Sequence, residues 1–155
     1  MFEVNNNTYV TVTEADEIVR ERFSRYDGLR IFWEVLDEEE KESYLLRAAE
    51  QIDALAYPGR KTYPTQDMTF PRFPDQVVPL KVKVAQVYNA LGFLNAEIKQ
   101  SAKEHQDIYE RMGVVFKPQV SPETGFAPLP DKLPLASAKA CETLKLYRMG
   151  GFRMR

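Results

Sequence analysis

The chain has little of the side-chain chemistry on which metal sites and disulfides depend. Its 155 residues include one cysteine, Cys141, and one histidine, His105. A single cysteine excludes a disulfide within the chain and favours a reducing compartment. One histidine and one cysteine are too few for a His/Cys metal site, so we expect no metal and no cofactor. We interpret His105 as a surface residue and Cys141 as a small buried apolar residue.

The motifs of common enzymes are also missing. The sequence contains no glycine-rich phosphate loop, no GxSxG and no HExxH, and no pair of acidic residues is marked out by spacing. We therefore expect a protein that is not an enzyme. No apolar run approaches the roughly 18 residues of a membrane helix, and "MFEVNNNTYV" lacks the basic start and apolar stretch of a signal peptide. We expect no contact with a membrane.

The charges that are present divide unevenly along the chain. The first 57 residues carry 14 acidic and 6 basic side chains, a net charge of −8, and the remaining 98 carry 9 acidic and 15 basic, a net charge of +6. Two solvated faces explain this split, and so does a subunit whose acidic side meets the basic side of a neighbour. The total of −2 lacks the basic excess of a dedicated nucleic-acid binder.

Helical periodicity dominates the sequence. We predict a first helix over residues 14–25, capped by Thr13 and stopped by Gly28. In a second helix over "DEEEKESYLLRAAEQIDALA", Asp37 is the N-cap and Glu40 the N3 residue. The predicted inward side chains of these two helices are Ile18, Val19, Phe23, Leu45, Ala48, Ala49, Ile52 and Leu55.

A third helix follows Pro79, and its apolar stripe is the clearest in the chain. Gly92 lies in its middle, where we expect a close contact with another helix. "AKEHQDIYERM" either extends this helix or forms another, and "LASAKACETLKLYRM" predicts a last one. The predicted inward side chains of the third and last helices are Leu80, Val84, Val87, Leu91, Leu94, Ile98, Ala138, Cys141, Leu144 and Tyr147.

These elements predict a mainly α fold, a small bundle of about four to five helices. One domain spans residues 1–149, and "GVVFKPQV" adds a short β element. Residues 115–134, which are rich in proline, form an extended connector. Residues 150–155 follow as a basic tail that begins with two glycines.

The stretch "YPGRKTYPTQDMTFPRFP", Tyr57 to Pro74, joins the second and third helices; we call it the strap. Four prolines stiffen it, which argues against a flexible linker. We favour a strap packed on the helices, with Phe70 and Phe73 mostly buried. The alternative is a surface that binds single-stranded nucleic acid through stacking aromatics and basic residues. The candidate residues for that alternative are Arg60, Lys61, Tyr63, Phe70 and Arg72.

The order of these segments resembles a known family. "TYVTVTEADE", a pair of helices rich in aromatics, "DEEEKESYLLRAAEQID", "GRKTYPTQDMTFPR" and "VPLKVKVAQVYNAL" follow one another as in the head–tail adaptor (connector or neck) proteins of tailed bacteriophages and prophages. Some of these relatives carry the label DnaT-like single-stranded-DNA-binding protein. The similarity is best over residues 8–96, and residues 103–132 match no pattern of the family.

The resemblance implies a ring of subunits beneath the portal, usually twelvefold, in the neck of a virion assembled in the bacterial cytoplasm. Such a ring binds the portal protein and the tail or stopper protein, and DNA passes through its channel without sequence recognition. The end of the chain alternates apolar and basic residues, as an anchor would, although a frayed basic terminus would also explain it. The candidate portal-binding residues are Tyr147, Arg148, Met149, Phe152, Arg153, Met154 and Arg155. A single-stranded-DNA-binding module and an unrelated helical scaffold remain the other readings.

Overall fold

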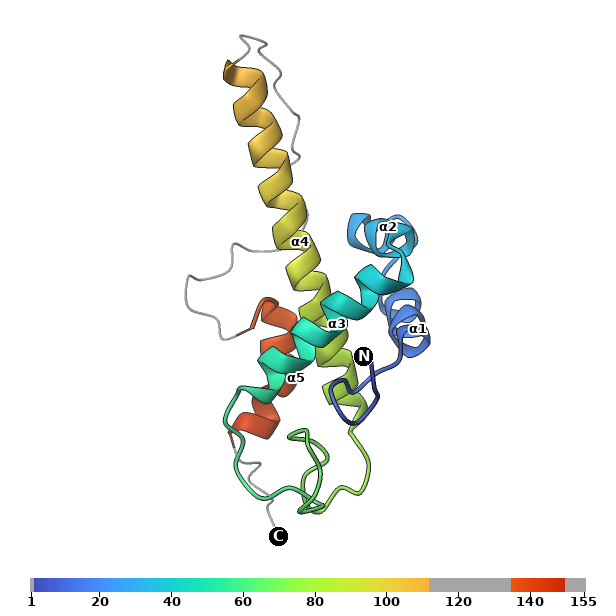
Figure 1. Ribbon diagram of the computed structural model, residues 1–155, viewed down its shortest axis with the longest axis vertical. Coiled ribbons are helices and arrows are strands. Elements are labelled where there is room, and N and C mark those ends of the chain that lie inside the picture. Colours follow the sequence, from blue (N-terminus) through green and yellow to red (C-terminus); the bar gives the residue numbers. More distant parts are fainter. Residues whose placement is uncertain (1, 112–134, 150–155) are drawn as a thin grey trace.

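The computed structural model describes residues 2–111 and 135–149 and confirms a mainly α, small helical bundle (Figure 1). The predicted strand at 113–120, the connector at 115–134 and the tail at 150–155 all lie outside these residues. Within them, β pairing is limited to isolated bridges at Val4–Thr8 and Lys61–Arg72. The helices of the described part are α1 (Val12–Arg22), α2 (Gly28–Val35), α3 (Glu38–Asp53), α4 (Leu80–Arg111) and α5 (Ala138–Arg148).

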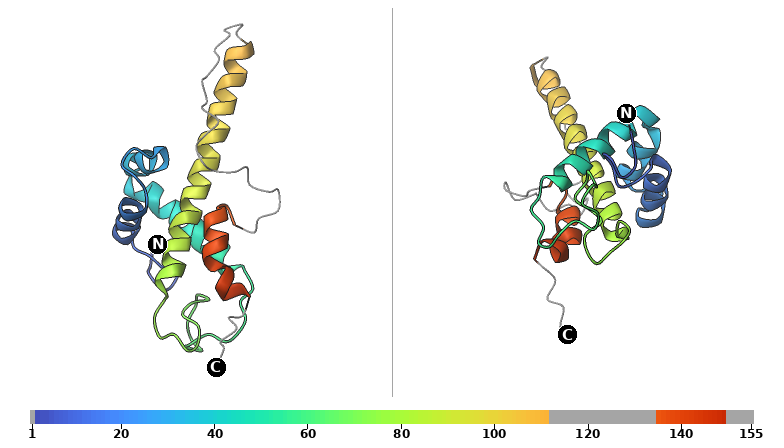
Figure 2. Two further views of the ribbon diagram at one scale, coloured as in Figure 1. Left: turned by 180° about the vertical axis from the view of Figure 1, so that it is seen from behind. Right: turned by 60° about the horizontal axis from the view of Figure 1, so that its bottom comes forward.

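Helix α4 is the central element of the bundle. Helices α1, α2 and α3 pack along one side of it and α5 packs against the other, while its far end extends beyond the body (Figures 1 and 2). The third predicted helix thus continues through "AKEHQDIYER" to Arg111 as one helix. Of its predicted stripe, Val84, Val87, Leu91 and Leu94 are buried, whereas Leu80 in the first turn is 63% exposed.

The starts of the first three helices follow from capping. Helix α3 begins with the predicted box, in which the Asp37 side chain accepts from the Glu40 amide and Glu40 reaches back to Asp37. Helix α1 begins two residues earlier than predicted, because Thr11 and Glu14 form the box that we assigned to Thr13. It also ends earlier, at Arg22.

The prediction that Gly28 stops the first helix is wrong. Gly28 is the first residue of α2, and the Asp27 side chain caps that helix by accepting from the Leu29 amide. Helix α2 then carries Trp33 into the core, where its side chain is fully buried. The apolar patch "RIFWEVL" is therefore a short helix in its own right.

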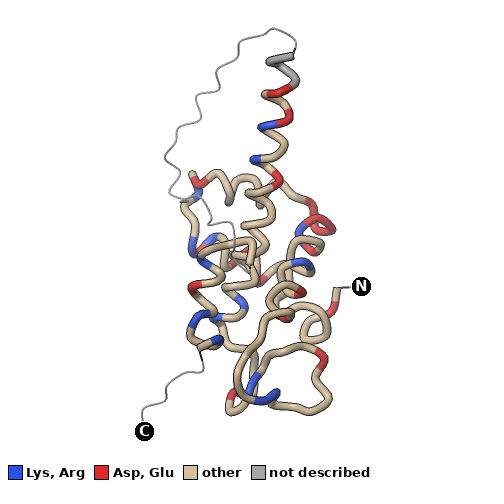
Figure 3. The backbone as a smooth tube through the Cα atoms, turned by 90° about the vertical axis from the view of Figure 1, so that its left-hand side faces the viewer, with Lys and Arg blue, Asp and Glu red and all other residues tan. Residues whose placement is uncertain are grey.

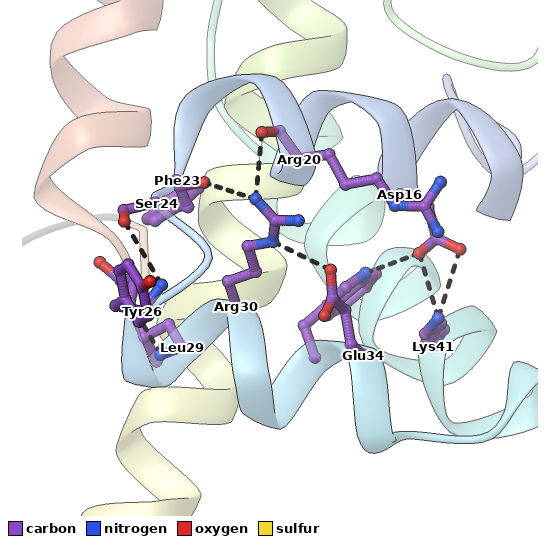
Figure 4. A network of polar contacts seen from close by, with 11 residues as sticks. Asp16, Arg20, Phe23, Ser24, Tyr26, Leu29, Arg30, Glu34 and Lys41 are labelled. Atoms are coloured by element: carbon purple, nitrogen blue, oxygen red, sulfur yellow. Dashed lines mark hydrogen bonds and ion pairs between the residues drawn. The ribbon is translucent and has the colours of Figure 1, made fainter.

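A polar network holds α1, α2 and α3 together (Figure 4). The Asp16 carboxylate accepts from the Trp33 indole N–H at 2.8 Å and from the Lys41 ammonium at 3.1 Å. Arg30 of α2 donates to the carbonyl of Phe23, at 3.0 Å, and forms an ion pair with Glu34. Asp16 of α1 is thus bonded to both α2 and α3, and Arg30 ties α2 to the C-terminal end of α1.

Helix α5 is rotated slightly from the predicted register. Ala140 and Leu144 are buried, Cys141 and Tyr147 are half-buried, and Ala138 is exposed although we predicted it to face inward. Ala138 lies in the first turn, directly after the N-cap Ser137, whose hydroxyl oxygen accepts from the Ala140 amide. The packing of the segment before this cap against α4 fixes that turn.

The contact that fixes the first turn of α5 is made at Gly92 of α4. A Cβ atom at position 92 would lie 2.6 Å from the Ala136 carbonyl oxygen and 2.7 Å from its carbon. The close approach that we expected at Gly92 is present, although the neighbour is the backbone before α5 rather than another helix. The missing side chain lets α5 start directly against α4.

We expect Gly92→Ala to destabilise the protein. Alanine is about 1 kcal/mol better than glycine inside a helix, but a clash with backbone forces shifts that typically cost about 1–3 kcal/mol. Thermal unfolding followed by circular dichroism measures the balance. Gly28→Ala is the matched control, because no atom lies within 4 Å of its added Cβ. A Gly92→Ala protein at least as stable as wild type would contradict the close packing.

Candidate nucleic-acid interface

The strap leaves α3 and folds back on itself below the bundle before α4 begins (Figure 1). Its two limbs pair through the Thr62 amide, which donates to the Pro71 carbonyl at 3.2 Å, and the Phe73 amide, which donates to the Arg60 carbonyl at 3.0 Å. Gly59 turns the chain with a φ of +88°, a conformation that side chains with a Cβ rarely adopt. The strap is therefore an ordered loop with its own hydrogen bonds.

Phe70 anchors this loop in the core, as predicted. Its side chain is 2% exposed. Three tyrosines meet its ring edge to face, with centroid distances of 4.9 Å for Tyr57, 5.5 Å for Tyr147 and 5.9 Å for Tyr9. A ring enclosed in this way offers no face on which a base could stack. In this conformation Phe70 therefore cannot stack on a base, as the nucleic-acid hypothesis requires.

Two of the basic candidates bind the strap itself. The Arg72 guanidinium donates to the carbonyls of Tyr57, Pro58 and Gly59. The Lys61 ammonium donates to the carbonyls of Gln66 and Asp67, at 3.2 and 3.0 Å. These bonds satisfy backbone oxygens that an irregular loop leaves without partners. Arg72 and Lys61 thus serve the loop's own structure.

Gln66 completes these internal ties. Its amide nitrogen donates to the carbonyls of Met68 and Pro71, and its amide oxygen accepts from the Tyr63 backbone N–H. The loop is thus held in shape by the turn at Gly59, by the packing of Phe70, and by the hydrogen bonds of the Lys61, Gln66 and Arg72 side chains.

Tyr9 and Asp53 bind the strap to the body, and the sequence reading missed both. The Asp53 carboxylate accepts from the Tyr9 hydroxyl and from the Thr69 amide, the latter at 3.2 Å. Burial, and then the hydrogen bond to Asp53, raises the pKa of Tyr9 above its usual range, so the hydroxyl stays a donor. One signal was available: Asp53 ends α3, where the helix dipole disfavours a carboxylate unless it has a partner.

The remaining aromatic and basic candidates lie at the surface. Phe73 is 59% exposed, so the prediction that it is buried is wrong. The chain has reversed by this point, and the Arg60 guanidinium covers one face of the ring at 4.6 Å from its centroid. Tyr63 is half exposed and donates its hydroxyl to the Gln76 carbonyl. Figure 3 shows basic positions at the tip of the strap.

The candidate portal-binding residues divide in the same way. Tyr147 packs against Phe70 and is half-buried, so it belongs to the core and not to a separate arm. Arg148 and Met149 are exposed. The other candidates, Phe152, Arg153, Met154 and Arg155, lie outside the described residues.

Neither a group of potential metal ligands nor a membrane-spanning helix is present among the described residues. Across residues 2–111 and 135–149, no three His, Cys, Asp or Glu side chains are grouped so that they could hold a metal ion. The helices of the same ranges include none that is long and apolar enough to cross a membrane. His105 is exposed, as predicted, and burial raises the pKa of the half-buried Cys141 thiol, which suits a packing role.

We expect Phe70→Ala to be strongly destabilising. Truncation of a well-buried phenylalanine typically costs about 3–5 kcal/mol, so the midpoint of denaturant unfolding should fall sharply. Phe73→Ala is the matched control in the same loop, and because Phe73 is exposed its effect should be small. Equal losses for the two variants would contradict the enclosed Phe70 cluster. A stable Phe70→Ala protein that lost DNA binding would favour the stacking interface instead.

Comparison with known proteins adds one finding to this geometry. A family model described as "Putative DnaT-like ssDNA binding protein" matches residues 2–118. Neither the curated proteins nor the solved structures include a match to the chain. The matched range covers α1 to α4 and the whole strap. The chain therefore belongs to the DnaT-like family.

Proposed function

We propose that the chain is a structural assembly subunit, a head–tail adaptor that forms a ring under the portal of a tailed phage and docks the tail or stopper. The observation that carries the proposal is which side chains are bonded or buried within the fold and which are exposed. Phe70, Lys61 and Arg72, which a DNA-binding strap would present, are engaged inside the fold. Large apolar side chains elsewhere are left exposed, as in subunits that await neighbours.

Helix α2 supplies the first such surface. Ile31, Phe32 and Val35 are 48%, 50% and 79% exposed. Their spacing places them on one face of the helix, opposite the buried Trp33. An apolar face of this kind costs solubility unless another protein covers it.

The far end of α4 supplies the second. Residues 99–107 are all exposed, and the helix extends beyond the body of the bundle (Figures 1 and 2). From residue 99 to Arg111 the rise is about 20 Å at 1.5 Å per residue. On this end the basic positions lie nearer the body and the acidic positions nearer the tip (Figure 3). A projecting, charged helix suits contact with neighbouring subunits of an assembly better than it suits an isolated domain.

The description of the family supports a second candidate, a single-stranded-DNA-binding module. In its favour, Arg60, Tyr63 and Phe73 lie exposed at the tip of the strap. Exposed aromatic rings beside a guanidinium can stack bases. Against it, the whole chain has a net charge of −2, and phosphate contacts supply most of the affinity for single strands.

Deletion of residues 151–155 tests the adaptor. We expect the truncated protein to keep its melting temperature, because Tyr147 and Leu144 hold α5 without the tail. It should lose binding to the portal protein of the same phage or prophage, measured by co-sedimentation with assembled portal. Undiminished portal binding would show that the tail is not the anchor. An intact chain that does not bind portal would contradict the adaptor itself.

Binding of labelled oligo(dT), measured by fluorescence anisotropy at low and moderate salt, tests the second candidate. The adaptor proposal predicts weak binding that vanishes at moderate salt, since it would come from phosphate contacts alone. Arg60→Ala with Phe73→Ala is the informative variant, because both side chains are exposed. Tight binding at moderate salt that this double substitution abolishes would establish the DNA-binding module in place of the adaptor.

A further inference from the structure

We infer that two copies of this chain bind head to tail, with the apolar face of α2 from one copy seated in a groove between α1, α4 and α5 of the next. The inference rests on the proposed function only in that both require self-assembly. The structure supplies the two surfaces and their charges. We call them the α2 face (Ile31, Phe32 and Val35) and the α1–α5 groove.

The groove has a volume of about 600 Å³ and an apolar floor. Leu80 from the first turn of α4 and Leu146 from α5 are each 63% exposed, and Tyr88 lies between them. The leucine side chains therefore remain in water in a single copy. Covering them would release that apolar surface from water at about 25 cal/mol per Å².

The rim of the groove is mainly basic. Arg22, Lys81 and Lys139 line it, and Glu142 is the one acid among its lining residues. Lys139 also lies over the Tyr88 ring, 5.7 Å from its centroid. A cation rim around an apolar floor selects for a partner that is apolar at its centre and acidic at its edge.

The α2 face has this composition. Its three apolar side chains are followed at once by an acidic run: residues 34–40 contain five acids and no base. These acids continue into the first turn of α3, where the helix dipole holds them in place. The match in charge with the groove identifies a second copy of the chain as the occupant.

The two surfaces lie on different parts of the molecule. The groove opens along α4 between α1 and α5, whereas α2 lies at the outer corner formed with α3 (Figures 1 and 2). A contact between unlike surfaces is heterologous, so each added copy leaves one face and one groove free. Such a contact repeats from copy to copy, and it forms a ring where the rotation between copies closes and an open filament where it does not.

A pair of half-disabled variants tests the contact. Phe32→Glu removes the α2 face and leaves the groove, while Leu146→Glu removes the groove and leaves the face. Both side chains are at least half exposed, and circular dichroism checks that each variant folds. Val77→Glu, at a position that is 75% exposed and belongs to neither surface, is the matched control.

Sedimentation velocity over a wide range of protein concentration gives the readout. We expect the wild-type chain and Val77→Glu to self-associate, more weakly at high salt, and each half-disabled variant to stay monomeric. An equimolar mixture of the two variants should form a one-to-one dimer and stop there, because only one good contact is available. A wild-type chain that is monomeric throughout, or a mixture that stays monomeric, would overturn the inference.

Together with the portal co-sedimentation assay, these data separate this inference from the adaptor proposal. Portal binding that survives while the mixed variants fail to dimerise would reject the α2–groove contact alone. Dimerisation of the mixture by a chain that never binds portal would reject the adaptor and keep the contact.

Discussion

The enclosure of Phe70 is the contact on which most of this structure depends. Its ring receives the edges of tyrosines from three separate segments: Tyr9 before α1, Tyr57 at the start of the strap and Tyr147 in α5. Asp53 at the end of α3 fixes the Tyr9 hydroxyl and the Thr69 amide beside it. This ring therefore joins the N-terminal segment, the strap and α5.

That dependence changes how the strap's composition is understood. Aromatic and basic residues close together in sequence are typical of a nucleic-acid surface. Here most of them are either buried or hydrogen-bonded to backbone carbonyls of the strap. Arg72 donates hydrogen bonds to three carbonyl oxygens, and the Phe70 ring has no exposed face. The backbone carbonyls of an irregular loop need hydrogen-bond donors. This requirement explains why a loop with four prolines contains the basic side chains of Lys61 and Arg72. Arg60, Tyr63 and Phe73 remain exposed on the strap, and apolar side chains remain exposed on α2 and α5, which suits binding to protein.

Local signals predicted the helices and much of the core, because capping and 3.6-residue periodicity act within a few residues. The Asp37–Glu40 box and the stripe Val84, Val87, Leu91 and Leu94 show this. One failure was local: Thr11 rather than Thr13 caps α1, because Thr11 and Glu14 form the capping box. The other failures have long-range causes. The partnership of Tyr9 with Asp53 joins residues 44 positions apart. The difference between Phe70 and Phe73 depends on distant partners: Phe70 is enclosed by Tyr9 and Tyr147, whereas Phe73 lies at the surface under Arg60. Neither of these relationships produces a periodic pattern in the sequence.

The central claim is that the strap is packed structure and not a DNA-binding loop. Amide hydrogen exchange of the intact protein, followed by mass spectrometry with and without oligo(dT), tests it most directly. The account predicts slow exchange at Thr62, Thr69 and Phe73, whose amides are hydrogen-bonded within the fold, and no change when DNA is added. Fast exchange at these amides in the free protein, slowed on addition of DNA, would contradict it.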